Sequence, residues 1–522
     1  MKGGTVMSFS PKQGSAITNT RLYVPNSVAT LSGMCAACSA DCIGTCEIGQ
    51  SAIRGDEAIY PDKTDVNQFG SEKNYPLDYS HLNINGRVFG LEQLTPEKMS
   101  FRNVDIETCY GLKNKVKMRA PLILPALAKL NWKDYFTGAA ISGIPAVIGE
   151  DAVHKDNRLV IRSKRVIESP LLREMTKCYR DYAQGYGDII LQANYDDEEI
   201  GVLEYAIQSL GIKSVELKLG QGAKGIQGIS YIKSKEDAIK FHQLGYLIYP
   251  NPLKEGVLDA FNNGEFHSFE RVGKLPRWRE GDLVKRTDQL RMLGAERVNL
   301  KVGPFDPRDL INILILAAEA RVDLITFDGA GGGSGNSPVK MMNEWGVPTL
   351  YLESILYMAL QKMKEKKISL PQIAIAGGFS MEDQIFKGLA LGAPFVQFVG
   401  IGRAAMAAAM VGSKVGDMIS KGELHKNYQV WGNDIESVFR EYGTLKKQYG
   451  DDAKSISTGA IGVYSYINRV STGLKQFMAL NRKYSLEAVD RHDIYPLTPI
   501  AAEVTGLKTY IESAREYLDR MW

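Results

Sequence analysis

Four cysteines lie close together near the N-terminus, within the stretch MCAACSADCIGTCEIGQSA. They are Cys35, Cys38, Cys42 and Cys46, spaced C-x2-C-x3-C-x3-C. Four thiolates in one short segment can ligate a 4Fe–4S cluster. Structural zinc usually takes its ligands as two separated pairs, and disulfides require an oxidising compartment. We therefore predict an iron–sulfur cluster here, with 4Fe–4S as the expected type and with zinc and disulfides as the alternatives.

Two lysines interrupt apolar runs that are typical of buried strands. Lys218 lies in VELKLG and Lys301 in NLKVG. A lysine at such a position is poorly explained as a solvated surface residue, so we expect it to face a bound anion or an electron-rich ring. The alternative is a buried ion pair with Glu216 or another carboxylate. Asp328, at the end of the run DLITFDG, is a candidate hydrogen-bond acceptor or acid/base group.

Glycines follow three of these apolar runs. The segment FDGAGGGSGNSP includes Gly332 and Gly333, AIAGGF ends in the pair 377–378, and VGIGRA contains the pair 402–403. Glycine lets the backbone approach an anion or a flat ring, and free N–H groups at a helix start bind phosphate. Each motif alone is compatible with an ordinary tight turn. Together, on consecutive strands, they predict a phosphate-bearing cofactor or substrate.

The elements that would position these residues are short β-branched or apolar runs, each followed by a helical pattern. Such runs suit parallel strands that are buried on both faces. The eight expected strands are 120–127, 144–150, 187–194, 214–220, 297–303, 323–329, 372–378 and 395–403. Eight β/α units in series predict a (β/α)8 TIM barrel, an α/β fold, in preference to an open doubly wound sheet.

The composition limits the classes of function. The chain has 522 residues, a net charge of +3 and 24% charged residues, which gives no electrostatic case for nucleic acid as a partner. No apolar run is long enough for a membrane span, and the N-terminus lacks the apolar region of a signal peptide. We expect a cytoplasmic protein with reduced thiols.

Several motifs resemble the FMN-binding synthase region of the glutamate synthase family, in its shorter archaeal-type form. VELKLGQGAKGIQG (215–228) is similar to the family's IEIKxGQGAKPGxGG, and ITFDGAGGGSGNSP (325–338) to its DGxxGGTGASP. The segment IAIAGGFSMEDQIFKGLALGA and the C-terminal DRHDIYPLTPIAAEVTGL also resemble family segments. The similarity covers roughly 80–410 and part of the C-terminal region.

The resemblance implies an FMN-containing barrel that reduces 2-iminoglutarate, formed from 2-oxoglutarate and ammonia, to L-glutamate. Lys301, Asp328 and Lys224 would be the catalytic residues. The cofactor would be held by Gln192, Lys301, Gly332, Gly333, Gly377, Gly378, Gly402 and Arg403, with the last four at its phosphate and Lys301 at the edge of the isoalloxazine ring. The substrate would be bound by Gln221, Lys224 and Glu150.

The chain also departs from the family pattern. The family's strand-one motif SxMSxGALS reads LPALAKLNW here, and its NTGEGG reads VIGEDA. The family's cluster cysteines follow strand eight, whereas here the cysteines precede the barrel. No glutaminase domain is recognisable, so we expect free ammonia or ammonia from a separate glutaminase subunit. No nicotinamide-binding fingerprint is recognisable either, so we expect electrons from ferredoxin or a redox partner subunit.

These observations predict three segments: 1–80 with the cluster motif, 81–412 as the barrel with an insertion at about 222–290, and 413–522 as a helical extension. Two alternatives to a glutamate synthase-type enzyme stay open. One is a flavin subunit of a larger electron-transfer complex that acts on another substrate. The other is a non-catalytic electron-transfer subunit that keeps the barrel.

Overall fold

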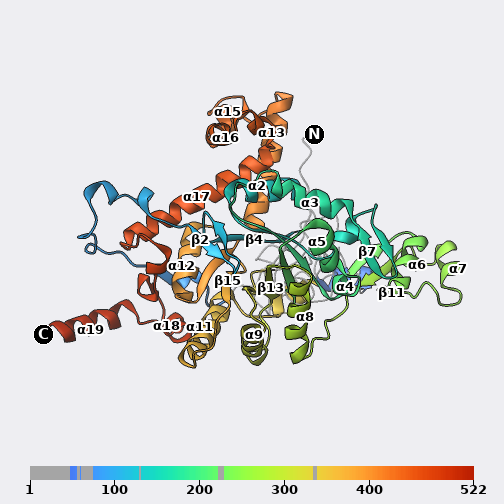
Figure 1. Cartoon of the computed structure of the whole chain (residues 1–522), viewed down its shortest axis with the longest axis horizontal. Coiled ribbons are helices and arrows are strands. Elements are labelled where there is room, and N and C mark those ends of the chain that lie inside the picture. Colours follow the sequence, from blue (N-terminus) through green and yellow to red (C-terminus); the bar gives the residue numbers. More distant parts are fainter. Residues whose placement is uncertain (1–46, 56–58, 60–74, 128–130, 221–228, 333–337) are drawn as a thin grey trace, which may run out of the picture.

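A closed barrel of eight parallel strands forms the centre of the molecule (Figure 1). The computed structural model describes residues 47–55, 59, 75–127, 131–220, 229–332 and 338–522. The neighbouring strands in the barrel are, in order, β13, β14, β15, β16, β4, β5, β8 and β9. Their bounds are β4 Leu122–Leu127, β5 Ala146–Ile148, β8 Ile189–Ala193, β9 Ser214–Lys218, β13 Arg297–Val302, β14 Leu324–Asp328, β15 Gln372–Ala376 and β16 Val396–Gly400. All eight predicted strands are present, and the predicted (β/α)8 fold is confirmed.

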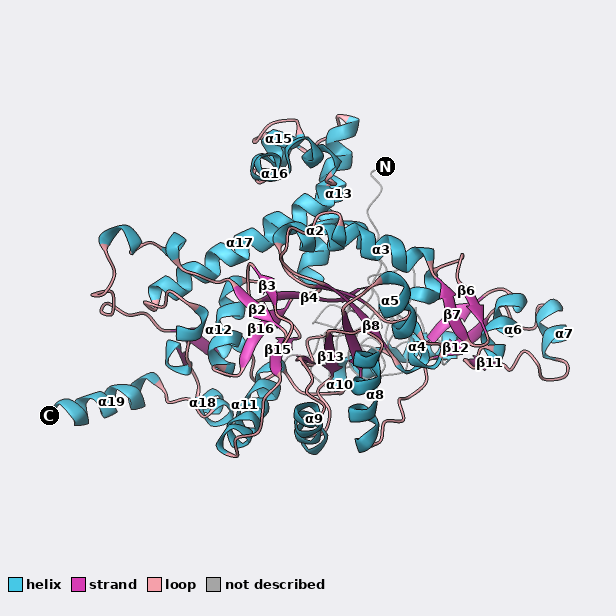
Figure 2. Ribbon diagram, in the orientation of Figure 1, coloured by secondary structure: helices cyan, strands magenta, loops and turns pink. Residues whose placement is uncertain are grey.

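Helices surround the barrel (Figure 2). The outer helices are α2 Trp132–Ser142, α3 Pro170–Arg180, α5 Val202–Leu210, α8 Glu280–Met292, α9 Pro307–Glu319, α11 Thr349–Glu365, α12 Glu382–Gly392 and α13 Arg403–Lys421. α9 shows why such segments are helical. Asp306 caps its first turn, a proline stands at its first position, and Leu310, Leu314 and Ala317 form the buried face at helical spacing.

A small sheet is inserted between β9 and β13, within the predicted insertion. It consists of β10 (Ile229–Ile232), β12 (Phe269–Val272) and β11 (Leu247–Tyr249), with α6 (Lys235–Gln243) and α7 (Val257–Asn262) between the strands. Tyr246 and Phe269 belong to the separate apolar cluster of this unit. A hairpin of β6 (Val160–Arg162) and β7 (Arg165–Glu168) precedes α3. Figure 1 shows both units at the right of the barrel.

The C-terminal region packs against the outside of the barrel. α17 (Thr458–Leu480) lies against α13 and α2, and glycines permit the close contact: a Cβ on Gly138 would lie 2.4 Å from the Val463 side chain. β17 (Ile494–Pro496) pairs with the early strand β1 (Leu82–Ile84), so distant parts of the chain join there. The remaining helices are α1 Glu47–Arg54, α4 Tyr195–Glu199, α10 Val339–Glu344, α14 Lys426–Gln429, α15 Ile435–Val438, α16 Tyr442–Tyr449, α18 Pro499–Thr505 and α19 Tyr510–Met521. None of the described helices combines the length and the apolar character that crossing a bilayer requires.

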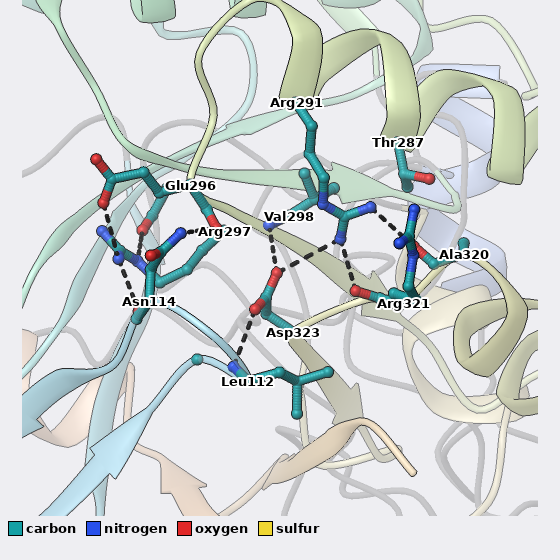
Figure 3. Close-up of polar contacts among 12 residues, drawn as sticks. Leu112, Asn114, Thr287, Arg291, Glu296, Arg297, Val298, Ala320, Arg321 and Asp323 are labelled. Atoms are coloured by element: carbon teal, nitrogen blue, oxygen red, sulfur yellow. Dashed lines mark hydrogen bonds and ion pairs between the residues drawn. The ribbon is translucent and has the colours of Figure 1, made fainter. Parts of the chain in front are cut away.

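The hairpin of β2 (Thr108–Tyr110) and β3 (Val116–Met118) closes the N-terminal end of the barrel. Asp323, at the start of β14, accepts hydrogen bonds from the backbone N–H groups of Leu112 and Val298, both at 3.0 Å, and lies 3.6 Å from the Arg291 guanidinium (Figure 3). One buried carboxylate thus joins the hairpin, a barrel strand and an outer helix. At this end of a TIM barrel, such a contact serves stability.

We expect Asp323→Ala to lower the free energy of unfolding by about 3 kcal/mol, because it leaves a buried N–H group, a part-buried N–H group and a guanidinium without their acceptor. Urea denaturation measures the change. Asp288→Ala is the matched control, since Asp288 is half-exposed and contacts only arginine side chains nearby. An equal, small effect of both substitutions would contradict the assignment.

A buried carboxyl group outside the barrel joins α11 to the N-terminal region. The Tyr79 hydroxyl donates to Glu353 Oε2 at 2.5 Å, and Glu353 is fully buried. Burial raises the pKa of Glu353 to about 8, against the opposing effects of Tyr79 and Arg491. The carboxyl group therefore keeps its proton in the folded protein at neutral pH.

Because the folded state holds this proton up to about pH 8, while the unfolded state releases it near its ordinary pKa of 4.5, the folded state binds more protons in that window. We expect stability to fall as pH rises from 4.5 to 8, by a few kcal/mol in all. Glu353→Gln, which resembles the protonated acid, should remove this part of the pH dependence. Urea denaturation of both proteins from pH 5 to 9 tests it, and parallel pH profiles would refute it.

Candidate functional site

Two buried lysines face the inside of the barrel near its C-terminal end. Asn299 and Lys301 alternate with outward-facing apolar residues on β13, and Lys301 lies in register with Lys218 on β9. Both lysine residues are at most 5% exposed. Alternation along a strand directs every second side chain to the same face, so a charged residue inside an apolar run is directed into the barrel. The active sites of TIM barrels are built at this end.

Each lysine has a carboxylate partner. Lys301 Nζ lies 3.0 Å from Asp328 Oδ2, and Lys218 Nζ donates to Glu150 Oε1 at 2.5 Å. The partners are thus Asp328 and Glu150 rather than Glu216. The ion pair between Lys301 and Asp328 Oδ2 lacks hydrogen-bond geometry, so the buried Lys301 ammonium has no hydrogen-bond partner among the described residues. The other oxygen of this carboxylate, Asp328 Oδ1, is also buried without such a partner there. Both atoms are available to a polar ligand.

A layer of polar side chains lies beneath the lysines. Gln192, Glu216 and Asn299 are in register on β8, β9 and β13, and Gln192 Nε2 donates to Glu216 Oε1 at 2.5 Å. Burial raises the pKa of Glu216, and the charge of Lys301 opposes this shift. Gln192 Oε1 and both side-chain polar atoms of Asn299 have no hydrogen-bond partner within the described chain. The sequence analysis named Gln192 and missed Asn299. Asn299 lies two residues before Lys301 on the same strand, and this spacing could have indicated that both side chains face the inside of the barrel.

The glycines after β14 and β15 are in close mutual contact. A Cβ on Gly332 would lie 2.1 Å from Asp328 Oδ1, and one on Gly331 would lie 2.7 Å from the carbonyl oxygen of Gly377. Gly377 has φ of +110° and accepts a hydrogen bond from Thr349 Oγ1 at 2.5 Å. These contacts have no room for a side chain, so the glycines position the Asp328 carboxylate and the loop over it. Thr349 was not predicted.

A second group of residues offers backbone donors at the same end. Gly402 is the N-cap of α13, a helix of 19 residues, and among the described residues no side chain caps this helix start, where first-turn N–H groups can bind an anion. Gly378 has φ of +104°, and no atom of the described residues lies within 4 Å of a Cβ position there. The exposed Arg403 donates to the carbonyl oxygen of Gly331 at 2.9 Å, so the loops after β14 and β16 meet. This arrangement of donors fits a phosphate group.

Several predicted site residues lie outside the described part of the chain. They are Cys35, Cys38, Cys42, Cys46, Gln221, Lys224 and Gly333. Their roles stay predictions. The structure brings together the other predicted residues in two groups: Lys301, Asp328, Gln192 and Glu150 with the polar layer, and Gly332, Gly377, Gly378, Gly402 and Arg403 in the adjoining loops.

A further cluster lies beside this site and was not predicted. Asp151 and His154, after β5, approach Asp197 on α4 and Arg271 on β12. Burial raises the pKa of Asp197, whereas Arg271 and His154 outweigh burial and hold the pKa of Asp151 at about 2. The sequence showed a histidine after the second barrel strand, but nothing in it indicated that residues 151, 197 and 271 would meet.

The closed barrel, with its charged and glycine-rich C-terminal end, defines a (β/α)8 barrel of the kind that carries active sites in its βα loops. Residues 277–414 match the family model described as "Conserved region in glutamate synthase". This match confirms the resemblance to the glutamate synthase family and covers about a quarter of the chain, from α8 to the middle of α13. Among curated proteins, no sequence matches.

The chain also resembles solved structures, all with low sequence identity to it. The recombinant flavin-binding domain of baker's yeast flavocytochrome b2 is 12% identical, with a TM-score of 0.44, over 84% of this chain and 81% of that chain. (S)-Mandelate dehydrogenase is 12% identical, with a TM-score of 0.41, over 80% and 89%. A lactate oxidase of Pediococcus acidilactici is 14% identical, with a TM-score of 0.37, over 81% and 88%.

Proposed function

We propose that this chain is an FMN-dependent oxidoreductase of the glutamate synthase type. It reduces 2-iminoglutarate, formed from 2-oxoglutarate and ammonia, to L-glutamate. The observation that carries the proposal is that the matched region 277–414 contains Lys301, Asp328 and the glycine-rich loops, and that these residues meet at one end of the barrel. When bound, FMN supplies hydride transfer to the imine carbon.

The residues present fit both the phosphate of FMN and the polar edge of its isoalloxazine ring. Gly377, Gly378, Gly402 and Arg403 would hold the phosphate, because a helix start without a side-chain cap, beside glycine backbone, provides N–H donors for an anion. Lys301 would face the edge of the ring and offset the negative charge of the reduced form. Its buried ammonium has no hydrogen-bond acceptor within the described residues, as expected for a group that awaits a ligand.

The substrate would lie above the lysines, where Gln221 and Lys224 are proposed to bind its carboxylates. Glu150, paired with Lys218, would form the opposite wall. Asp328 would hold a proton or accept a hydrogen bond from the substrate's nitrogen, and this role is supported by its Oδ1, which has no hydrogen-bond partner in the described chain. Gly332 and Gly333 would lie against the ring.

Electrons would reach FMN through a 4Fe–4S cluster on Cys35, Cys38, Cys42 and Cys46. The donor would be ferredoxin or a partner subunit, and ammonia would be free or supplied by a separate glutaminase subunit. The support for the cluster is the spacing of the four thiols.

Anaerobic purification, followed by visible spectra and assays of iron, sulfide and flavin, tests the cofactors. About four irons per chain and one FMN are expected, and Cys→Ser substitutions at the four positions should remove only the iron. Glutamate formation from 2-oxoglutarate and ammonia, with an artificial reductant, tests the reaction. A colourless protein that carries zinc would refute both assignments.

A second candidate is a flavin subunit that transfers electrons without the synthase reaction. It is favoured by the two altered motifs, LPALAKLNW and VIGEDA, in place of family motifs at the first two strands. Flavin that is reduced and reoxidised with a protein acceptor, and is insensitive to 2-oxoglutarate and ammonia, would support this candidate. Glutamate formation would exclude it.

A further inference from the structure

Three parts of the chain meet beside the barrel opening: the turn after β5, the short helix α4 and the inserted sheet. Asp151, His154 and Asp197 each direct one ligand atom into a common space, and these atoms lie within 4.8 Å of one another. His154 Nε2 is 3.8 Å from Asp151 Oδ1 and 3.6 Å from Asp197 Oδ1. The backbone N–H of Lys274, just after β12, donates to Asp196 of α4 at 3.2 Å, so α4 lies beside the inserted sheet.

The orientation of the Asp197 carboxylate is set by its other oxygen. Asp197 Oδ2 accepts the backbone N–H of Asp151 at 3.0 Å and, at 3.4 Å, that of Asn194, with which Asp197 forms a capping box. Asp197 Oδ1 therefore faces His154. This oxygen belongs to a side chain that is 1% exposed, and it has no hydrogen-bond partner among the described residues. A buried carboxylate oxygen without a hydrogen-bond partner is costly, which indicates a missing ligand.

The nearby cationic side chains, Arg271, Lys274 and Lys155, act on Asp151 and Asp196, which leaves the charge around Asp197 unbalanced. Three carboxylates, on Asp151, Asp196 and Asp197, converge here. Arg271 lies 3.1 Å from Asp151 Oδ2, and Lys274 contacts Asp196 at 3.8 Å while also pairing with Glu199. In the described chain Asp197 has only one ion-pair partner, the His154 ring, which is neutral unless protonated. A cation at the common space would correct the imbalance.

We propose that Asp151 Oδ1, Asp197 Oδ1 and His154 Nε2 bind a divalent transition-metal cation. Two carboxylate oxygens and one imidazole nitrogen suit Mn²⁺, Fe²⁺ or Zn²⁺. In the tetrahedral geometry that is usual for zinc, bonds of about 2.2 Å place ligand atoms about 3.6 Å apart, which is close to the two distances from His154 Nε2, 3.6 and 3.8 Å. Arg271 contacts the other oxygen of Asp151 and so orients the ligand from outside. The Tyr246 hydroxyl, 2.8 Å from His154 Nε2, would give up that hydrogen bond.

The cation would fix the two loops that follow β5 and β8. Asp151 directly follows Glu150, the partner of Lys218, so the cation would also hold one wall of the candidate site. Binding requires neither FMN nor the iron–sulfur cluster.

Titration of the EDTA-treated full-length protein with Mn²⁺, followed by the EPR signal of free Mn²⁺, tests the proposal. Mn²⁺ is the probe because thiolates bind it poorly, so the N-terminal cysteines compete little. One Mn²⁺ per chain is expected, and Asp197→Asn and His154→Gln should each weaken binding at least 50-fold. His267→Gln, at an exposed position in the insertion, is the control and should bind like the wild type.

Thermal unfolding provides a second readout that does not depend on activity. Mn²⁺ should raise the Tm of the wild type and leave that of Asp197→Asn unchanged, because only a native site gains stability from its ligand. Without metal, Asp197→Asn should be at least as stable as the wild type, since it removes an unpaired buried charge. Absence of stoichiometric Mn²⁺ binding, or equal binding by the wild type and Asp197→Asn, would overturn the proposal.

Discussion

Lys301→Gln is expected to lower kcat/KM for glutamate formation at least 100-fold. The substitution removes a buried positive charge from the place where, in the proposed function, the reduced flavin and the transition state would carry negative charge, and such preorganised charges contribute factors of about 100 to 1000. It also leaves Asp328 without its ion-pair partner, which costs about 3 to 5 kcal/mol of stability when a pair is buried. A single substitution therefore mixes two effects.

The double variant Lys301→Gln/Asp328→Asn separates them. It removes both charges of the pair, so most of the lost stability should return while turnover stays low. Lys213→Gln is the matched control, because Lys213 is half-exposed at the opposite end of the barrel and pairs with Glu296. Steady-state kinetics and urea denaturation of these three variants, each compared with the wild type, measure the two effects. A double variant that turns over near the wild-type rate would show that Lys301 serves only the ion pair.

Gly402→Asp is expected to abolish tight FMN binding without unfolding the protein. Gly402 has φ of −94°, which any residue can adopt, and the one described atom that an added Cβ would approach is Pro125 Cγ, at 3.4 Å. A carboxylate at the start of α13 interacts favourably with the helix dipole, so stability should stay within about 1 kcal/mol of the wild type. The same carboxylate would occupy the proposed phosphate position and repel the FMN phosphate. We expect the Kd for FMN to rise about 100-fold.

Gly402→Asn is the control for this substitution, since it has the same shape without the charge. Its affinity for FMN should stay within a few-fold of the wild type. Titration of the flavin-free proteins with FMN, followed by flavin fluorescence, measures the Kd, and thermal unfolding verifies the fold. Equal Kd values for the Asp and Asn variants would place the phosphate elsewhere.

Much of the barrel and of the candidate site could be predicted from the local pattern. Every expected strand is present, because a strand buried on both faces needs a continuous apolar run, and that property is written in consecutive residues. Lys301, Asp328 and the glycines after β15 and β16 stood out for the same reason: a lysine inside such a run, or a glycine at its end, breaks the pattern.

What the sequence could not indicate depends on which residues meet across the chain. The partner of Lys218 is Glu150, the Gly377 carbonyl accepts from Thr349, and β1 pairs with β17.

The cluster of Asp151, His154, Asp197 and Arg271 is the clearest example, because its members come from separate elements and none of them is unusual in its own segment. The strands, the inward-facing charged residues and the glycine-rich loops could be predicted from the sequence because they follow from periodicity and local conformation. The ion-pair partners and the side-chain clusters could not, since they form only when the barrel closes and the insertion docks beside it.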